Sequence, residues 1–154
     1  MSWEELKRRI YHEDGSLRDI YIRNITPDDW KRWVDYVNSS YVVDFEVGNT
    51  VRRNKIDFEV VVAYWKGQEH QCPSASIHIG NIIVKTYFFV ENEIENDIAP
   101  KEITTLQDHE RIIEYLKNIS KLLGRPVELT EENYQDPKEL LMVVHEEQVI
   151  FPSK

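Results

Sequence analysis

The chain has 154 residues, of which 41% are hydrophobic and 11% aromatic, with 5 Gly and 6 Pro. These proportions are typical of a folded globular protein and exclude a disordered or linker-rich chain. Lys and Arg number 19 and Asp and Glu 28, so the formal net charge is −9. A surface of this sign repels nucleic-acid phosphates and anionic membranes, whereas it attracts a basic protein. The charge therefore predicts no nucleic-acid and no membrane binding, and it favours a basic protein partner.

The cysteine content and the first residues predict the compartment. The one cysteine, Cys72, cannot form an internal disulfide, and the chain starts with acidic residues where a secretory signal has basic and apolar ones. We therefore expect a cytoplasmic protein. Neither a repeat nor a Pro-, Ser- or Gly-rich linker interrupts residues 1–154, so the sequence predicts a single domain.

The first 40 residues contain two helix signals and one strand signal. A capping-box pattern predicts a helix at about residues 3–11, and residues 17–23 follow as a strand. A Thr-Pro pair then starts a helix over residues 27–38. Its apolar stripe consists of Trp30, Trp33, Val34 and Val37. A tryptophan pair on such a stripe is typical of the core, with an exposed interface anchor as the alternative.

Alternating apolar and polar residues predict a series of strands in the middle of the chain. They are residues 41–47, 56–64, 76–79 and 82–88. Gly80 and Asn81 form a two-residue connection whose leading glycine suits a tight type II′ turn, with Ile79 facing Ile82 and Ile77 facing Val84. The connections are too short for crossover helices, so these strands are expected to pair in antiparallel fashion.

The last third begins with a polar stretch, residues 91–104, which we interpret as a loop. A helix is predicted over residues 105–123, because its apolar face ends at Gly124. A short strand at 127–129, a helical turn after Asp136 and a last strand at 142–151 complete the chain. The predicted fold class is α+β, a mainly antiparallel sheet with two principal helices packed on one face.

The common motifs for dinucleotides, phosphates, acyl transfer and zinc are absent from the sequence. His70, Cys72 and His78 come nearest to a metal cluster, but structural zinc requires four well-spaced ligands, so we predict no metal and no cofactor. Cys72 has no neighbouring positive charge to activate its thiol, and a small packed residue is the better interpretation. No catalytic residue is predicted, and the sequence leaves open whether the chain is an enzyme.

Four acidic residues lie close together at Glu91, Glu93, Glu95 and Asp97. Calcium binding, an acid/base pair and a solvated loop are the alternatives, but the spacing lacks the Asp/Asn-Gly core of an EF-hand loop. Since unpaired buried charge is costly, we expect most of these carboxylates to be exposed. We interpret them as a partner-binding edge.

Four segments resemble those of small bacterial proteins that include immunity proteins of polymorphic toxins. The segments are DGSLRDIY at 14–21, Asp29-Trp30, IENDIAP at 94–100 and LGRPVELTEEN at 123–133. The resemblance implies an acidic, non-catalytic protein that binds a basic toxin domain.

The leading hypothesis is therefore a cytoplasmic protein-binding domain, an immunity protein that neutralises a basic toxin domain through an acidic surface. The alternative is a small enzyme or small-molecule-binding protein with a pocket between helix and sheet. A structural subunit is the third class, so a homo-oligomer stays open.

Overall fold

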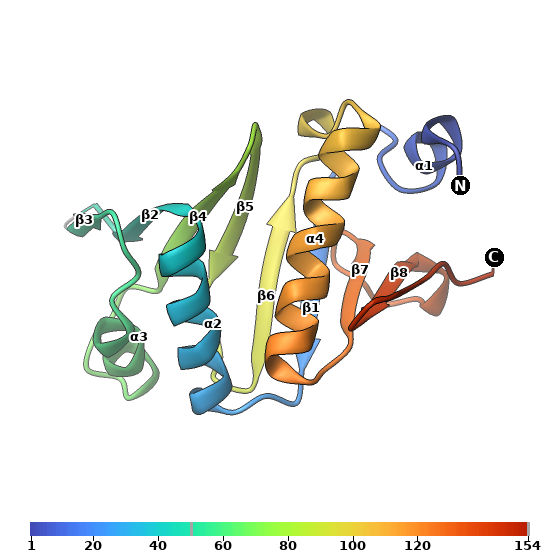
Figure 1. The fold of residues 1–154 in the computed structure, drawn as a ribbon. Coiled ribbons are helices and arrows are strands. Elements are labelled where there is room, and N and C mark those ends of the chain that lie inside the picture. The colour runs from blue at the N-terminus through green and yellow to red at the C-terminus, as the bar shows by residue number, and fades with distance from the viewer. Residues whose placement is uncertain (50, 154) are drawn as a thin grey trace.

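The computed structural model describes residues 1–49 and 51–153, in which nine strands form one sheet (Figure 1). The strands are β1 (Arg18–Arg23), β2 (Val42–Val47), β3 (Val51–Arg53), β4 (Pro73–Ile79), β5 (Ile82–Tyr87), β6 (Glu93–Ile98), β7 (Val127–Glu131), β8 (Leu140–His145) and β9 (Gln148–Ile150). The helices are α1 (Trp3–Arg9), α2 (Pro27–Ser40), α3 (Phe58–Trp65) and α4 (Leu106–Leu123), with short 3-10 turns η1 (Pro100–Glu102) and η2 (Pro137–Glu139).

The strands lie in the order β3-β2-β4-β5-β6-β1-β7-β8-β9, and every neighbouring pair in the described part of the chain is antiparallel. The N-terminal strand β1 lies near the centre, between β6 and β7. Helices α2 and α4 lie side by side on the same face of the sheet (Figure 1). The predicted α+β class with two principal helices on one face is therefore confirmed.

Local hydrogen bonds explain where the two long helices begin and end. The side chain of Thr26 accepts a hydrogen bond from the Asp29 amide, and Thr105 does the same for Asp108, so each helix starts with a capped first turn. Gly124 ends α4 with a φ of 64°, a left-handed conformation that glycine adopts without strain. Among the described residues, none of these helices is both long and apolar enough to cross a bilayer.

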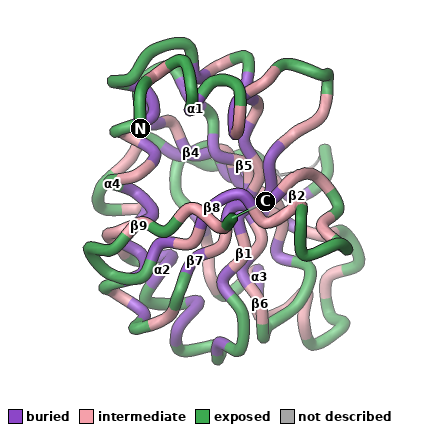
Figure 2. The backbone as a smooth tube through the Cα atoms, turned by 90° about the vertical axis from the view of Figure 1, so that its right-hand side faces the viewer, coloured by how far each residue is buried: buried purple, intermediate pink, exposed green. Residues whose placement is uncertain are grey.

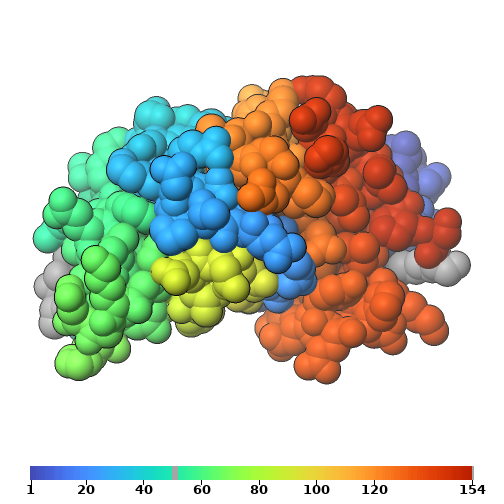
Figure 3. Space-filling view, turned by 90° about the horizontal axis from the view of Figure 1, so that it is seen from below, coloured from blue at the N-terminus to red at the C-terminus, as the bar shows by residue number. Residues whose placement is uncertain are grey.

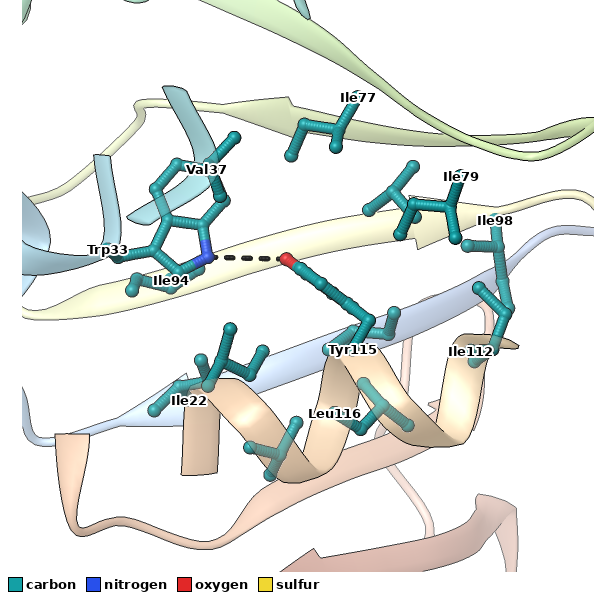
Figure 4. Close-up of a cluster of buried hydrophobic side chains, with 14 of the residues drawn as sticks. Ile22, Trp33, Val37, Ile77, Ile79, Ile94, Ile98, Ile112, Tyr115 and Leu116 are labelled. Carbon is teal, nitrogen blue, oxygen red and sulfur yellow. Dashed lines mark hydrogen bonds between the residues drawn. The ribbon is translucent and has the colours of Figure 1, made fainter. Parts of the chain in front are cut away.

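The core lies between the two helices and the inner face of the sheet. Trp30 and Trp33 are fully buried, with ring centroids 5.4 Å apart and planes at 89°, so the expectation that they belong to the core is confirmed. The Trp33 indole N–H donates to the Tyr115 hydroxyl at 3.2 Å, and Figure 4 shows this contact joining α2 to α4 among isoleucines of the strands. Exposed residues gather in the outer loops (Figure 2).

The prediction of a strand at residues 56–64 is wrong, because Phe58–Trp65 form helix α3. The Asp57 side chain accepts from the Glu59 amide and caps the first turn. Val61 is buried, and the Phe58 and Trp65 rings contact each other at 5.8 Å, which is helical rather than strand spacing. The β-branched and aromatic residues of this segment favour a strand, but the cap and the tertiary contacts override that propensity.

Two further segments differ from the prediction. The stretch at 91–104, interpreted as a loop, contains the central strand β6, because Ile94, Asn96 and Ile98 alternate inward between the outward acids. The single strand predicted at 142–151 is instead a hairpin of β8 and β9, which turns at Glu146 with a φ of 55°. The hairpin predicted around Gly80 is confirmed, with Ile79 opposite Ile82.

Candidate partner-binding face

The face of the sheet opposite α2 and α4 is the candidate functional site. We call it the open face and define it by the outward side chains of β2, β4, β5, β6, β1 and β7 (Figure 1). Seen from below in Figure 3, helices α2 and α4 lie at the top, and the molecule is hollowed beneath them between the green segment and the orange segment. The hollow leaves the central strands accessible from this side.

Strand β6 carries the predicted acidic residues to the centre of the open face. Because Ile94, Asn96 and Ile98 point into the core, the alternate side chains of Glu93, Glu95 and Asp97 point outward and are half-buried. Glu91 lies in the turn before the strand and is exposed. The four acids therefore lie at and along a central strand rather than in a loop. The expectation that most of them are exposed is wrong, because only Glu91 is exposed and the other three are half-buried.

Strand β1 places a second row of polar side chains beside β6. Asp19 lies opposite Asp97, Tyr21 opposite Glu95 and Arg23 opposite Glu93. We call Asp19, Glu93, Glu95 and Asp97 the acidic patch. Asp19 is its buried member, because the loop after β7 covers it and the Asn133 amide donates to its Oδ2 at 2.9 Å. The sequence showed the acids of β6, but the β1 residues were missed because nothing in one sequence reveals that these distant strands pair.

The contacts within the patch leave part of its charge uncompensated. Arg23 donates to Glu93 at 2.9 Å and to Glu128 at 2.8 Å. The Tyr21 hydroxyl lies 3.2 Å from Asp19 Oδ2 and 3.4 Å from Glu95 Oε1, so its one hydrogen serves two carboxylates. No ion pair joins Glu95 or Asp97 to a cation among the described residues; Lys85 lies opposite Asp97 on β5, and its charge lowers the pKa of Asp97 without outweighing burial.

Burial and mutual repulsion raise the pKa of Asp19, Glu95 and Asp97. Burial raises the pKa of Asp97 to about 6, and the charge of Asp19 adds to the effect. Burial also raises the pKa of Glu95, with further contributions from Asp19 and Glu93, and it raises the pKa of Asp19. The ionised forms of Asp19, Glu95 and Asp97 are therefore less favourable here than in water, and an incoming cation relieves this repulsion.

The Asp97→Asn substitution is expected to stabilise the protein at pH 7.5 by on the order of 1 kcal/mol, since Asp97 is partly solvated. Because the pKa of the Asp97 carboxyl is raised from 3.8 to about 6 in the folded state, the free energy of unfolding falls as the pH rises through that range. Urea unfolding at pH 7.5 and pH 3.5 measures the effect, and the gain should vanish at pH 3.5. Glu13→Gln, an exposed control, should change neither value; an equal gain at both pH values contradicts the argument.

The residues considered for a metal have other contacts. His78 Nε2 lies 2.8 Å from Asp44 Oδ2, and Cys72 contacts the Pro73 carbonyl oxygen at 3.4 Å. Within residues 1–49 and 51–153, no three His, Cys, Asp or Glu side chains are grouped as metal ligands. Burial raises the pKa of the Cys72 thiol, which disfavours the thiolate that a nucleophile requires.

A separate groove of about 550 Å³ lies between α4 and the C-terminal hairpin on the other side of the molecule. Leu106, Ile113 and Phe151 contribute its apolar lining. His109 also lines it and contacts the Tyr11 hydroxyl through Nδ1 at 2.6 Å. Burial lowers the pKa of His109 to about 4, so the imidazole is neutral at pH 7. The alternative hypothesis, a small-molecule pocket between helix and sheet, corresponds to this groove.

The architecture defines an antiparallel α+β protein whose two principal helices lie on one sheet face and whose acidic patch lies on the other. No family model and no curated protein sequence matches the chain. A chain of the 1.75 Å crystal structure of the toxic C-terminal tip of CdiA from Pseudomonas aeruginosa in complex with immune protein matches it with a TM-score of 0.53 and 9% sequence identity. The match covers 83% of this chain and 94% of that chain. The predicted resemblance to proteins of toxin and immunity systems is therefore confirmed at the level of the fold.

Proposed function

We propose that this chain is a cytoplasmic immunity-type protein whose open face binds a basic toxin domain and blocks it sterically. The observation that carries the proposal is the acidic patch, whose β6 carboxylates are half-exposed at the centre of a hollowed sheet face. The fold shared with a chain from a toxin–immune protein complex supports the same class of function. The mechanism requires no catalytic group.

The placement of these charges favours a role in partner binding over a role in stabilising the fold. Asp19, Glu95 and Asp97 are ionised at a cost, because burial raises the pKa of each carboxyl. Lysines or arginines of a partner would replace the lost hydration and compensate these charges. A net charge of −9 also speeds the approach of a basic domain.

Co-expression tests this proposal in cells. Genes beside the one for this chain are screened for a toxin domain, which is then induced with and without the chain, and growth is followed together with complex formation by size-exclusion chromatography with light scattering. The proposal predicts restored growth and a stable complex containing both proteins. Growth inhibition by this chain expressed alone would assign it to the toxin side, and continued killing in its presence would contradict the proposal.

A further inference from the structure

Next to the acidic patch, the surface forms a second depression of about 600 Å³. It lies between the end of α3 and the turn that leads from β5 to β6. Three aromatic rings line it, those of Tyr64, Trp65 and Phe89, together with the carboxylates of Glu69 and Glu91. Its described lining contains no lysine and no arginine, and its one basic side chain is that of His70.

We propose that this depression, the aromatic pocket, binds an arginine side chain of the partner, an inference that rests on the proposed function. A guanidinium stacks on aromatic faces and donates paired hydrogen bonds to carboxylates, and this lining offers both kinds of group. An acidic side chain would be repelled by Glu69 and Glu91, and a neutral side chain would leave their charges uncompensated, although Glu69 also accepts from the Gln71 amide at 3.1 Å. Glu91 thereby acquires a role different from that of the acids on β6, because it lines the pocket.

The wall of the pocket is held rigidly although residues 88–90 lie outside the strands. The Trp65 indole donates to the Phe88 carbonyl at 2.9 Å, and the Trp30 indole donates to the Val90 carbonyl at 3.2 Å. The Phe89 ring stacks on Tyr87 with centroids 5.2 Å apart and planes at 10°. A side chain that enters this pocket therefore meets surfaces that are already ordered, which lowers the entropic cost of binding.

Phe89 has the features of an interface anchor. Its side chain is 50% exposed and that of Val90 is 46% exposed, so two large apolar side chains face water side by side. Aromatic residues in such positions tend to dominate binding when a partner covers them. The patch on β6 accelerates encounter through its field, whereas the aromatic pocket retains the partner after contact.

Titration with a small probe tests the pocket without any partner protein. N-acetyl-arginine amide is added to the ¹⁵N-labelled protein at pH 8, and its neutral analogue N-acetyl-citrulline amide is the matched control. We expect saturable shifts of the Trp65 indole and of the amides near Phe89 and Glu91, with a dissociation constant on the order of 1–10 mM and at least about tenfold weaker binding of citrulline. Equal responses to the two probes, or shifts confined to β6, would overturn the assignment.

Binding kinetics with the toxin domain separate this inference from the proposed function. Phe89→Ala is expected to raise the dissociation rate about 10- to 100-fold and to leave the association rate within about twofold of the parent. Leu106→Ala is the matched control, because Leu106 is a 44% exposed apolar residue in the groove on the other side of the molecule. Circular dichroism and thermal unfolding confirm that both variants are folded.

The outcomes are distinguishable. If Phe89→Ala dissociates like the parent while the acidic patch variants still associate slowly, the aromatic pocket is not the anchor and the proposed function stands. If the parent protein fails to bind the toxin domain but discriminates arginine from citrulline, the proposed function fails and the pocket assignment stands.

Discussion

Replacing Glu93 and Glu95 with Gln and Asp97 with Asn is expected to slow association with the toxin domain about 10- to 100-fold at low salt. These three side chains lie along one strand at the centre of the open face, so their field points toward the docking partner. In 0.5 M salt the difference should shrink to about threefold or less, because screening confines the field to a few ångströms. Stopped-flow measurements at both salt concentrations give the rates.

The control is a second triple variant that removes the same number of negative charges from another part of the surface. Glu110, Glu114 and Glu147 line the groove on the other side of the molecule and are exposed there. Their replacement with Gln alters the net charge equally but should slow association much less. Equal slowing by the two triple variants would mean that net charge alone matters, and the acidic patch would then not be the docking surface.

The largest effect on stability is expected from Arg18→Ala, with a loss of about 3–5 kcal/mol. Arg18 is fully buried, and its guanidinium donates to the Ile10 carbonyl at 2.7 Å and to the His12 carbonyl at 2.8 Å. It also donates to Ser16 Oγ at 2.8 Å, so one side chain holds the connection between α1 and β1. Removing it leaves buried carbonyl groups unpaired and opens a cavity.

Urea unfolding measures this loss, and two variants sharpen its interpretation. Arg18→Lys keeps the charge but cannot reproduce the fork of donors, so we expect it to recover less than half of the stability. Arg8→Ala removes an exposed arginine from α1 and should change the free energy of unfolding by about 0.5 kcal/mol or less. A loss below about 1 kcal/mol for Arg18→Ala would contradict the structural role assigned to this residue.

The acidic patch sets the stability of the isolated protein against its affinity for a basic partner, and the predicted gain from Asp97→Asn is one consequence. Three carboxyl groups with raised pKa values lie together on β1 and β6 and weaken the folded state at pH 7. Binding surfaces often retain such unfavourable charges because a partner compensates them. The variant that stabilises the isolated protein is therefore expected to weaken its association with a basic partner.

The sequence predicted the elements whose signals are local. Caps at Thr26 and Thr105 and the glycine at 124 define α2 and α4 without reference to the rest of the chain. Helix α3 was missed because strand-forming residues fill it and only tertiary packing decides between the two states. Strand β6 was missed because its outward positions are acidic, although Ile94 and Ile98 carry the alternating signal.

The candidate site could be predicted only in part, because it combines residues that are distant in the sequence. The acids of β6 are close together in sequence and were recognised as a group. Their neighbours Asp19 and Tyr21 come from β1, and the aromatic pocket combines Trp65 with Phe89 from a different segment. Such combinations depend on strand pairing and packing between distant segments, which hydrophobic periodicity does not encode.

Carboxyl footprinting of the toxin complex tests the central claim most directly. Exposed carboxylates are coupled to glycine ethyl ester with a carbodiimide, and mass spectrometry compares the labelling of each residue in the free and the bound protein. The open face predicts strongly reduced labelling of Glu91, Glu93 and Glu95 in the complex, with unchanged labelling of Glu110 and Glu114 beside the α4 groove. Protection of Glu110 and Glu114 with full labelling of the other three would place the partner on the opposite side and contradict the account.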